Sequence, residues 1–142
     1  MKRYLFSFSL LINVLSINAQ TYQIDQLIDG KWMCSESEVD TIYREFSSIY
    51  MKYNRIISEE SLGVSSVKYY LSPTVPTKFD FAKVGTKSSG KYIVTYNEEL
   101  KDFSYVEIKA LSKDSLVLYY AWEPADESLR DKICYQKYKR VK

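Results

Sequence analysis

The side chains that could do chemistry are few, because the 142-residue chain contains no histidine. Histidine is the usual general base near neutral pH and the commonest metal ligand. A catalytic triad or a cysteine–histidine pair is therefore excluded. Two cysteines are also too few for a structural zinc site when histidine is absent. We expect no metal and no cofactor.

Acidic clusters are the remaining candidates for catalysis. They are Glu36, Glu38 and Asp40, then Glu59 and Glu60, then Glu98 and Glu99. A glycosidase needs two carboxylates that face each other across a cleft, one of them with a raised pKa. Glu36 and Glu38 fall on one face of an expected strand, and the later clusters fall in expected turns, where charged side chains are solvated. We therefore expect a protein that is not an enzyme.

The first nineteen residues have the layout of a secretory signal peptide. Lys2 and Arg3 precede an apolar run over 4–15, and the small polar stretch 16–20 allows a cut after Ala19. The run is too short to span a bilayer. We expect an exported protein, periplasmic or secreted, in which residues 20–142 form one domain without a transmembrane segment. Loss of the two basic residues cancels the net charge of +2, so no charge pattern favours binding to nucleic acid.

Cys34 lies near the start of this domain and Cys134 near its end. In an oxidising compartment an isolated pair of cysteines predicts a disulfide. A structural role is favoured over a redox role because the chain has no C-x-x-C motif.

The sequence pattern predicts that the elements which position the acidic residues and the cysteines are mainly β-strands. Fourteen tyrosines and alternating apolar positions favour an all-β fold. Strands are expected over 31–39, 67–71, 78–84, 91–96, 105–111, 115–122 and 132–139, after a lead-in with one helical turn over 24–28. The segment 41–58 fits either a helix, with apolar residues at helical spacing and Asp40 as its N-cap, or strands, which we favour.

Short strands joined by short turns predict an antiparallel meander. Two architectures fit, a closed up-and-down β-barrel and a two-sheet β-sandwich. In a barrel with an even number of strands, the first and last strands are antiparallel neighbours. Because Cys34 lies on the first strand and Cys134 on the last, a disulfide between them favours the barrel.

Four segments together resemble the lipocalin-like domains of exported bacterial proteins. They are Gly30-Lys31-Trp32, which matches the G-x-W motif, and residues 89–92, 105–108 and 111–118. The end of the signal peptide, Asn18-Ala19-Gln20, is similar to that of exported proteins from Bacteroides relatives. The resemblance implies a small antiparallel barrel that holds an apolar ligand.

The family also places an arginine of the last strand across the G-x-W tryptophan, and Arg140 is the candidate. A Cys34–Cys134 bridge would instead put Trp32 opposite Gln136, so the two contacts conflict. We keep the disulfide. Trp32 is expected to close one end of the barrel.

A ligand cavity is predicted along the alternating faces of the later strands. The faces comprise Leu116, Leu118, Tyr120 and Trp122 together with Tyr92, Val94, Tyr96, Val106 and Ile108. A packed core explains the same alternation. The predicted ligand-binding residues are Tyr92, Tyr96, Leu118, Tyr120 and Trp122, with an apolar or aromatic small molecule as the partner. Outward tyrosines such as those of Tyr69-Tyr70 and Tyr119-Tyr120 leave a second function open, contact with a protein or a glycan.

Overall fold

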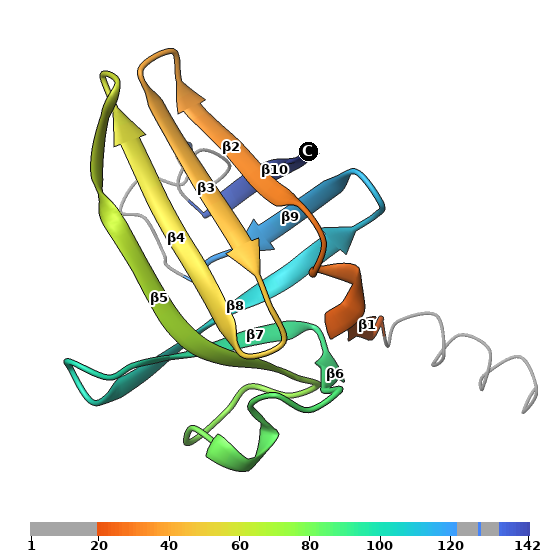
Figure 1. The fold of residues 1–142 in the computed structure, drawn as a ribbon. Helices are drawn as coiled ribbons and strands as arrows, with labels where there is room; N and C mark the ends of the chain where they lie inside the picture. Colours follow the sequence, from red (N-terminus) through yellow and green to blue (C-terminus); the bar gives the residue numbers. More distant parts are fainter. Residues whose placement is uncertain (1–19, 122–127, 129–133) are drawn as a thin grey trace, which may run out of the picture.

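The computed structural model describes residues 20–121, 128 and 134–142 (Figure 1). Within these residues eight antiparallel strands close into an up-and-down barrel, with the last strand beside the first, in the order β10-β2-β3-β4-β5-β7-β8-β9. The strands are β2 (Lys31–Ser37), β3 (Asp40–Phe46), β4 (Tyr50–Ile57), β5 (Glu60–Ser72), β7 (Tyr92–Asn97), β8 (Asp102–Leu111), β9 (Ser115–Tyr119) and β10 (Tyr135–Val141). The predicted all-β barrel is confirmed, and the sandwich alternative is wrong.

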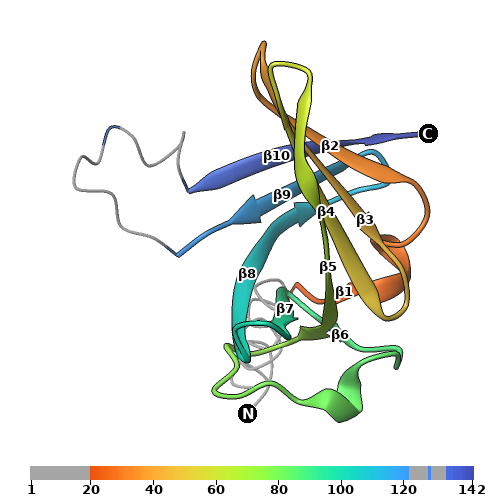
Figure 2. The ribbon, with the colours of Figure 1, turned by 60° about the vertical axis from the view of Figure 1, so that its left-hand side comes forward.

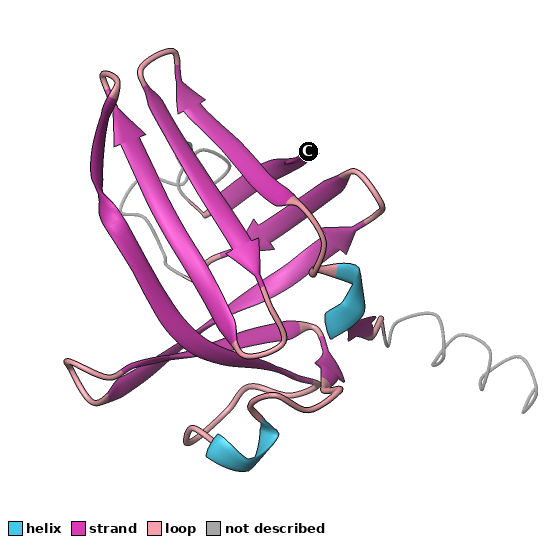
Figure 3. Cartoon of the chain, viewed as in Figure 1, coloured by secondary structure: helices cyan, strands magenta, loops and turns pink. Residues whose placement is uncertain are grey.

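Two short strands and two short 3-10 helices lie beside the barrel (Figure 3). β1 (Tyr22–Gln23) pairs with β6 (Ser89–Gly90), and η1 (Ile24–Gln26) follows β1 directly. The expected helical turn in the lead-in is thus confirmed. The strand expected over 78–84 is wrong, because this segment contains η2 (Phe81–Lys83), which Asp80 caps by accepting a hydrogen bond from the backbone N–H of Ala82.

The ambiguous segment 41–58 forms strands β3 and β4, which pair as a hairpin. Ile42, Arg44 and Phe46 are buried at every second position of β3, the period of a strand. Ile49, which completed the helical spacing in the sequence, lies exposed in the turn between the two strands. Asp40 is part of β3 and does not cap a helix.

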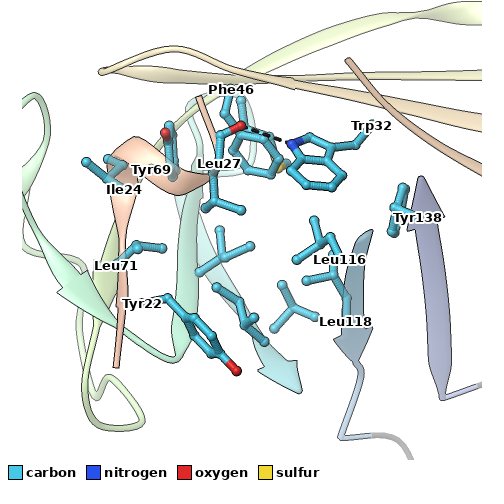
Figure 4. Close-up of a cluster of buried hydrophobic side chains, with 14 of the residues drawn as sticks. Tyr22, Ile24, Leu27, Trp32, Phe46, Tyr69, Leu71, Leu116, Leu118 and Tyr138 are labelled. Carbon is cyan, nitrogen blue, oxygen red and sulfur yellow. Dashed lines mark hydrogen bonds between the residues drawn. The ribbon is translucent and has the colours of Figure 1, made fainter. Parts of the chain in front are cut away.

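One end of the barrel, which we call the closed end, is filled by the lead-in segment (Figure 4). Ile24 and Leu27 are buried there against Trp32, which is fully buried. The indole Nε1 of Trp32 donates a hydrogen bond to the carbonyl oxygen of Leu27 at 2.9 Å. This contact satisfies the one polar atom of the indole, so the ring can close the barrel without an unpaired donor.

Arg140 lies across Trp32 at the closed end. The two residues are directly paired between β10 and β2, and the guanidinium carbon lies 4.2 Å from the indole centroid. The same guanidinium donates hydrogen bonds to the carbonyl oxygens of Gln26, Ile28 and Asp29 in the lead-in. Its Nε donates to the carbonyl oxygen of Lys113 in the β8–β9 turn at 2.7 Å. Arg140 therefore joins the lead-in, the last strand and this turn.

The predicted disulfide between Cys34 and Cys134 is wrong, since no bridge joins them. The register that pairs Arg140 with Trp32 carries Cys34 to a position opposite Tyr138. Cys134 lies four residues away along the chain, about 13 Å at roughly 3.3 Å per residue. A disulfide needs Cα atoms about 4–7 Å apart. The register that serves the Arg140–Trp32 contact thus separates the cysteines, and the sequence-based choice between the two contacts was the wrong one.

Candidate ligand-binding site

A cavity of about 450 Å³ opens into the barrel at the end opposite η1. We call this end, which carries the β2–β3, β4–β5 and β7–β8 turns, the mouth end; Figure 2 shows it from a second side. The residues that line the cavity come from strands β3, β4, β5, β7, β8 and β10 and from the position directly after β9. They are Arg44, Met51, Tyr53, Ser65, Val67, Ile93, Thr95, Asn97, Ser104, Tyr105, Val106, Tyr120 and Gln136.

The cavity wall changes from polar to apolar with depth. In the β4–β5 hairpin, Ser65 pairs with Tyr53 nearer the turn, and Val67 pairs with Met51 one step further in. In the β7–β8 hairpin the order is the same. Thr95 pairs with Ser104 nearer the turn and Ile93 pairs with Val106 further in. Because side chains alternate across a strand, each hairpin sends hydroxyl groups to the outer part of the cavity and apolar groups to the inner part.

Arg44 is the one ionised side chain among the described lining residues, and only 7% of it is exposed. Its Nε donates to the hydroxyl of Tyr138 at 2.9 Å, and its Nη2 donates to the hydroxyl of Tyr120 at 2.6 Å. Its Nη1 donates to the thioether sulfur of Met51 at 3.2 Å. The ring of Tyr53 lies 4.9 Å from the guanidinium carbon, a cation–π distance. All of these partners are electrically neutral.

The hydrogen bonds continue from Arg44 to the mouth end. The hydroxyls of Tyr138 and Tyr120 both donate to the side-chain oxygen of Gln136, at 2.6 Å and 3.1 Å. The Gln136 amide nitrogen donates to the carboxylate of Glu36 at 3.2 Å. Glu36 is exposed. The first carboxylate that this network reaches is therefore three hydrogen bonds away from the buried cation.

Burial decides the protonation of the groups around Arg44. It raises the pKa of the Tyr138 and Tyr120 phenols above their usual value, so both hydroxyls keep their protons at neutral pH. Burial acts to lower the pKa of Arg44, but the oxygens of Tyr138 and Tyr120 outweigh it, and the guanidinium stays charged. Burial, with the Glu36 carboxylate, raises the pKa of the Cys34 thiol to about 11, so this cysteine is a neutral thiol.

The structure distributes the predicted ligand-binding residues among several places. Tyr120 lines the cavity. Leu118 is fully buried in the core below it, together with Leu116 and Ile108. Trp122 lies outside the described residues. The prediction that these residues bind a ligand stays a prediction.

Tyr92 and Tyr96 are placed on the outer face of β7, because Ile93 and Thr95 are the residues of that strand that line the cavity. Tyr96 packs against Phe79 and Phe81, with ring centroids 5.1 Å and 4.8 Å away. Tyr92 packs edge-on against Tyr105 at 6.0 Å. The expected alignment of Tyr92, Val94 and Tyr96 with Val106 is wrong, since Val106 pairs with Ile93.

Sequence reasoning did not select Arg44, which is central to the cavity. A signal for it was present. Arg44 has the same parity as Ile42 and Phe46, so a strand that buries these two side chains must also send Arg44 inward. That signal depended on treating 41–58 as strands, where the pattern also fitted a helix.

The acidic clusters lie at the mouth end or in turns. Asp40 forms a bidentate ion pair with Arg55, with distances of 2.9 Å and 2.6 Å. Glu59 lies in the β4–β5 turn and Glu60 begins β5, whereas Glu98 and Glu99 lie in the β7–β8 turn; all four are exposed. Among the described residues no carboxylate lines the cavity. No cluster of three or more potential metal ligands occurs among the residues that the structure describes.

No protein-family model, curated protein or solved structure significantly matches this chain. Helices long and apolar enough to cross a membrane are likewise not found over the described residues. The site must therefore be interpreted from its own geometry.

Proposed function

We propose that the protein is an exported, lipocalin-like binding protein, not an enzyme, that holds an apolar or aromatic small molecule in the barrel. The observation that carries this proposal is the cavity of about 450 Å³ at the mouth end. Binding sites for small molecules are typically 300–1,000 Å³, mostly apolar, with a few placed polar groups. The cavity lies within this size range, and it combines apolar pairs in its inner part with polar groups in its outer part.

Two further features support a binding role. The closed end is filled by buried side chains of the lead-in segment, so the cavity is open at one end only. The described lining offers one guanidinium and several neutral polar groups, a set that suits recognition better than general acid–base chemistry. Export is proposed on the signal peptide predicted over residues 1–19, and the lipocalin-like family on the ordered set of segments described above.

A fluorescent probe tests the proposal. N-phenyl-1-naphthylamine is an uncharged aromatic molecule that becomes fluorescent in an apolar site, and we expect the purified protein to bind it with one saturable site. Ser65→Trp places a bulky ring in the cavity and should abolish the signal. Ser66→Trp is the matched control, because Ser66 pairs with Lys52 on the outer face of the barrel and should leave binding unchanged. No binding to the wild-type protein, or equal binding to all three proteins, would contradict a cavity site.

A second function, contact with a protein or a glycan, is favoured by one specific observation. Four aromatic rings form an outer aromatic patch on the barrel, comprising Tyr70, Phe79, Phe81 and Tyr96, with neighbouring centroids 4.8–5.1 Å apart. Phe81 is 54% exposed, which leaves a ring face available for stacking. A protein that binds no small molecule but binds a glycan array through this patch, with binding lost in Phe81→Ala, would favour the second function.

A further inference from the structure

We propose that the ligand is an amphiphilic carboxylic acid, and that Arg44 binds its carboxylate. This inference rests on the proposed binding function and adds the chemical class of the ligand. It comes from one conspicuous feature of the cavity, a buried cation that contacts neutral groups only.

The charge of the cavity selects an anion. Arg44 is the one ionised group among the described lining residues, and only 7% of its surface is exposed. A buried cation is costly unless an anion or strong acceptors compensate it. Its acceptors here are two phenol oxygens and a thioether sulfur, and sulfur is a weak acceptor.

Arg55 on the neighbouring strand shows the contrasting case. It pairs with Asp40 through two hydrogen bonds, Nε to one carboxylate oxygen and Nη2 to the other. Arg44 and Arg55 thus come from the same hairpin, one with a carboxylate of the chain and one without. The carboxylate that pairs with the Arg44 guanidinium is therefore supplied by the ligand.

The donors of Arg44 leave room for such a contact. A guanidinium has five N–H groups, and three of them donate to the partners described above. The planar guanidinium matches the two oxygens of a carboxylate. Gln136 also lines the cavity, and its amide nitrogen carries a second N–H, besides the one that donates to Glu36, that can donate to the same anion.

The apolar part of the cavity determines the chemistry of the ligand beyond its carboxylate. Two apolar pairs lie in the inner part of the cavity, Met51 with Val67 and Ile93 with Val106. The Met51 sulfur of the first pair also contacts Arg44. Burial of an apolar chain or ring against them provides affinity, and the carboxylate contact provides selectivity. A fatty acid or an aromatic carboxylic acid has both parts.

Three molecules with one apolar body and three charges test the proposal by calorimetric titration of the wild-type protein. They are decanoate, 1-decanol and decylammonium, each used below its aggregation concentration. We expect decanoate to bind at least about ten-fold more tightly than 1-decanol, and decylammonium to bind most weakly. Equal affinity for decanoate and 1-decanol would overturn the proposal and leave the binding function standing. No binding of any of the three would overturn both.

Arg44→Met then locates the effect. It should bring the affinities for decanoate and 1-decanol to within about two-fold of each other. The matched control is Lys52→Met, which removes the same charge from the exposed outer face of the same hairpin and should preserve the preference for decanoate. A preference that survives in Arg44→Met, or that is lost equally in Lys52→Met, would overturn the assignment to Arg44. If Arg44→Met does not fold, the three-ligand series on the wild-type protein decides.

Discussion

Replacing Arg140 tests how the closed end of the barrel is held together. The guanidinium stacks on Trp32 at 4.2 Å and donates to the carbonyl oxygens of Gln26, Ile28, Asp29 and Lys113. The stacking contributes about 1 kcal/mol. The partly buried hydrogen bond to Ile28 adds about 1.5 kcal/mol, and the more exposed bonds together add about 0.5 kcal/mol. Arg140→Met should therefore lower the free energy of unfolding by about 3 kcal/mol.

Urea denaturation followed by tryptophan fluorescence measures this loss. Arg140→Lys should lose about 1–2 kcal/mol, because an ammonium keeps the charge but cannot reach several carbonyls at fixed angles. Lys139→Met is the matched control, since Lys139 is exposed on the neighbouring position of β10, and its change should be within about 0.5 kcal/mol. A loss below about 1 kcal/mol in Arg140→Met would refute the reasoning.

Three further outcomes are expected. Gly90→Ala should lower the free energy of unfolding by about 2–3 kcal/mol in urea titrations, because its Cβ would lie 2.1 Å from the backbone of β5 at a φ of +152°; a stable variant would contradict this packing. Alkylation of the unfolded protein without a reducing agent should add two groups by intact mass, at Cys34 and Cys134, whereas an unmodified chain two hydrogens lighter would reveal a bridge. The hydrogen bond from Arg55 lowers the pKa of Asp40, so this pair stabilises the fold above about pH 4 and is lost as the pH falls through the lower folded pKa. Asp40→Asn should therefore flatten the acid side of the stability profile, and an unchanged profile would contradict the ion pair.

The barrel could be predicted because most strands bury one face only. Residues 115–119 show this plainly, since Leu116 and Leu118 are buried and alternate with less buried neighbours. Strand β7 did not permit the same inference. Ile93 faces the cavity, yet Val94 is also fully buried on the other face. Each face of β7 therefore carries a fully buried apolar side chain, so the alternation carried no information about which face is inside.

The course of residues 73–88 explains the second buried face. Phe79 packs against both Tyr70 and Tyr96, so part of this loop covers the outside of β5 and β7. No local sequence pattern predicts that a loop covers the outer face of β5 and β7, because this depends on contacts between residues far apart in the chain. The placement of Tyr96 on the inner face failed for this reason.

The cysteine pairing failed for a different reason. Cys34 lies on β2 as predicted, but Cys134 lies directly before β10, and the observed register differs by four residues from the one that would pair the two cysteines. Arg140 and Trp32 make a stack and several hydrogen bonds in the observed register. This register separates Cys34 from the position of Cys134, and the sequence pattern alone does not specify the register.

The central claim is that the cavity at the mouth end holds a small molecule, and native mass spectrometry tests it most directly. The protein is purified under mild conditions from cells that produce it, as wild type and as Ser65→Trp. We expect a reproducible extra mass on the wild-type protein that disappears on denaturation and is absent from Ser65→Trp. A wild-type protein of bare polypeptide mass, or the same extra mass on both proteins, would contradict the claim.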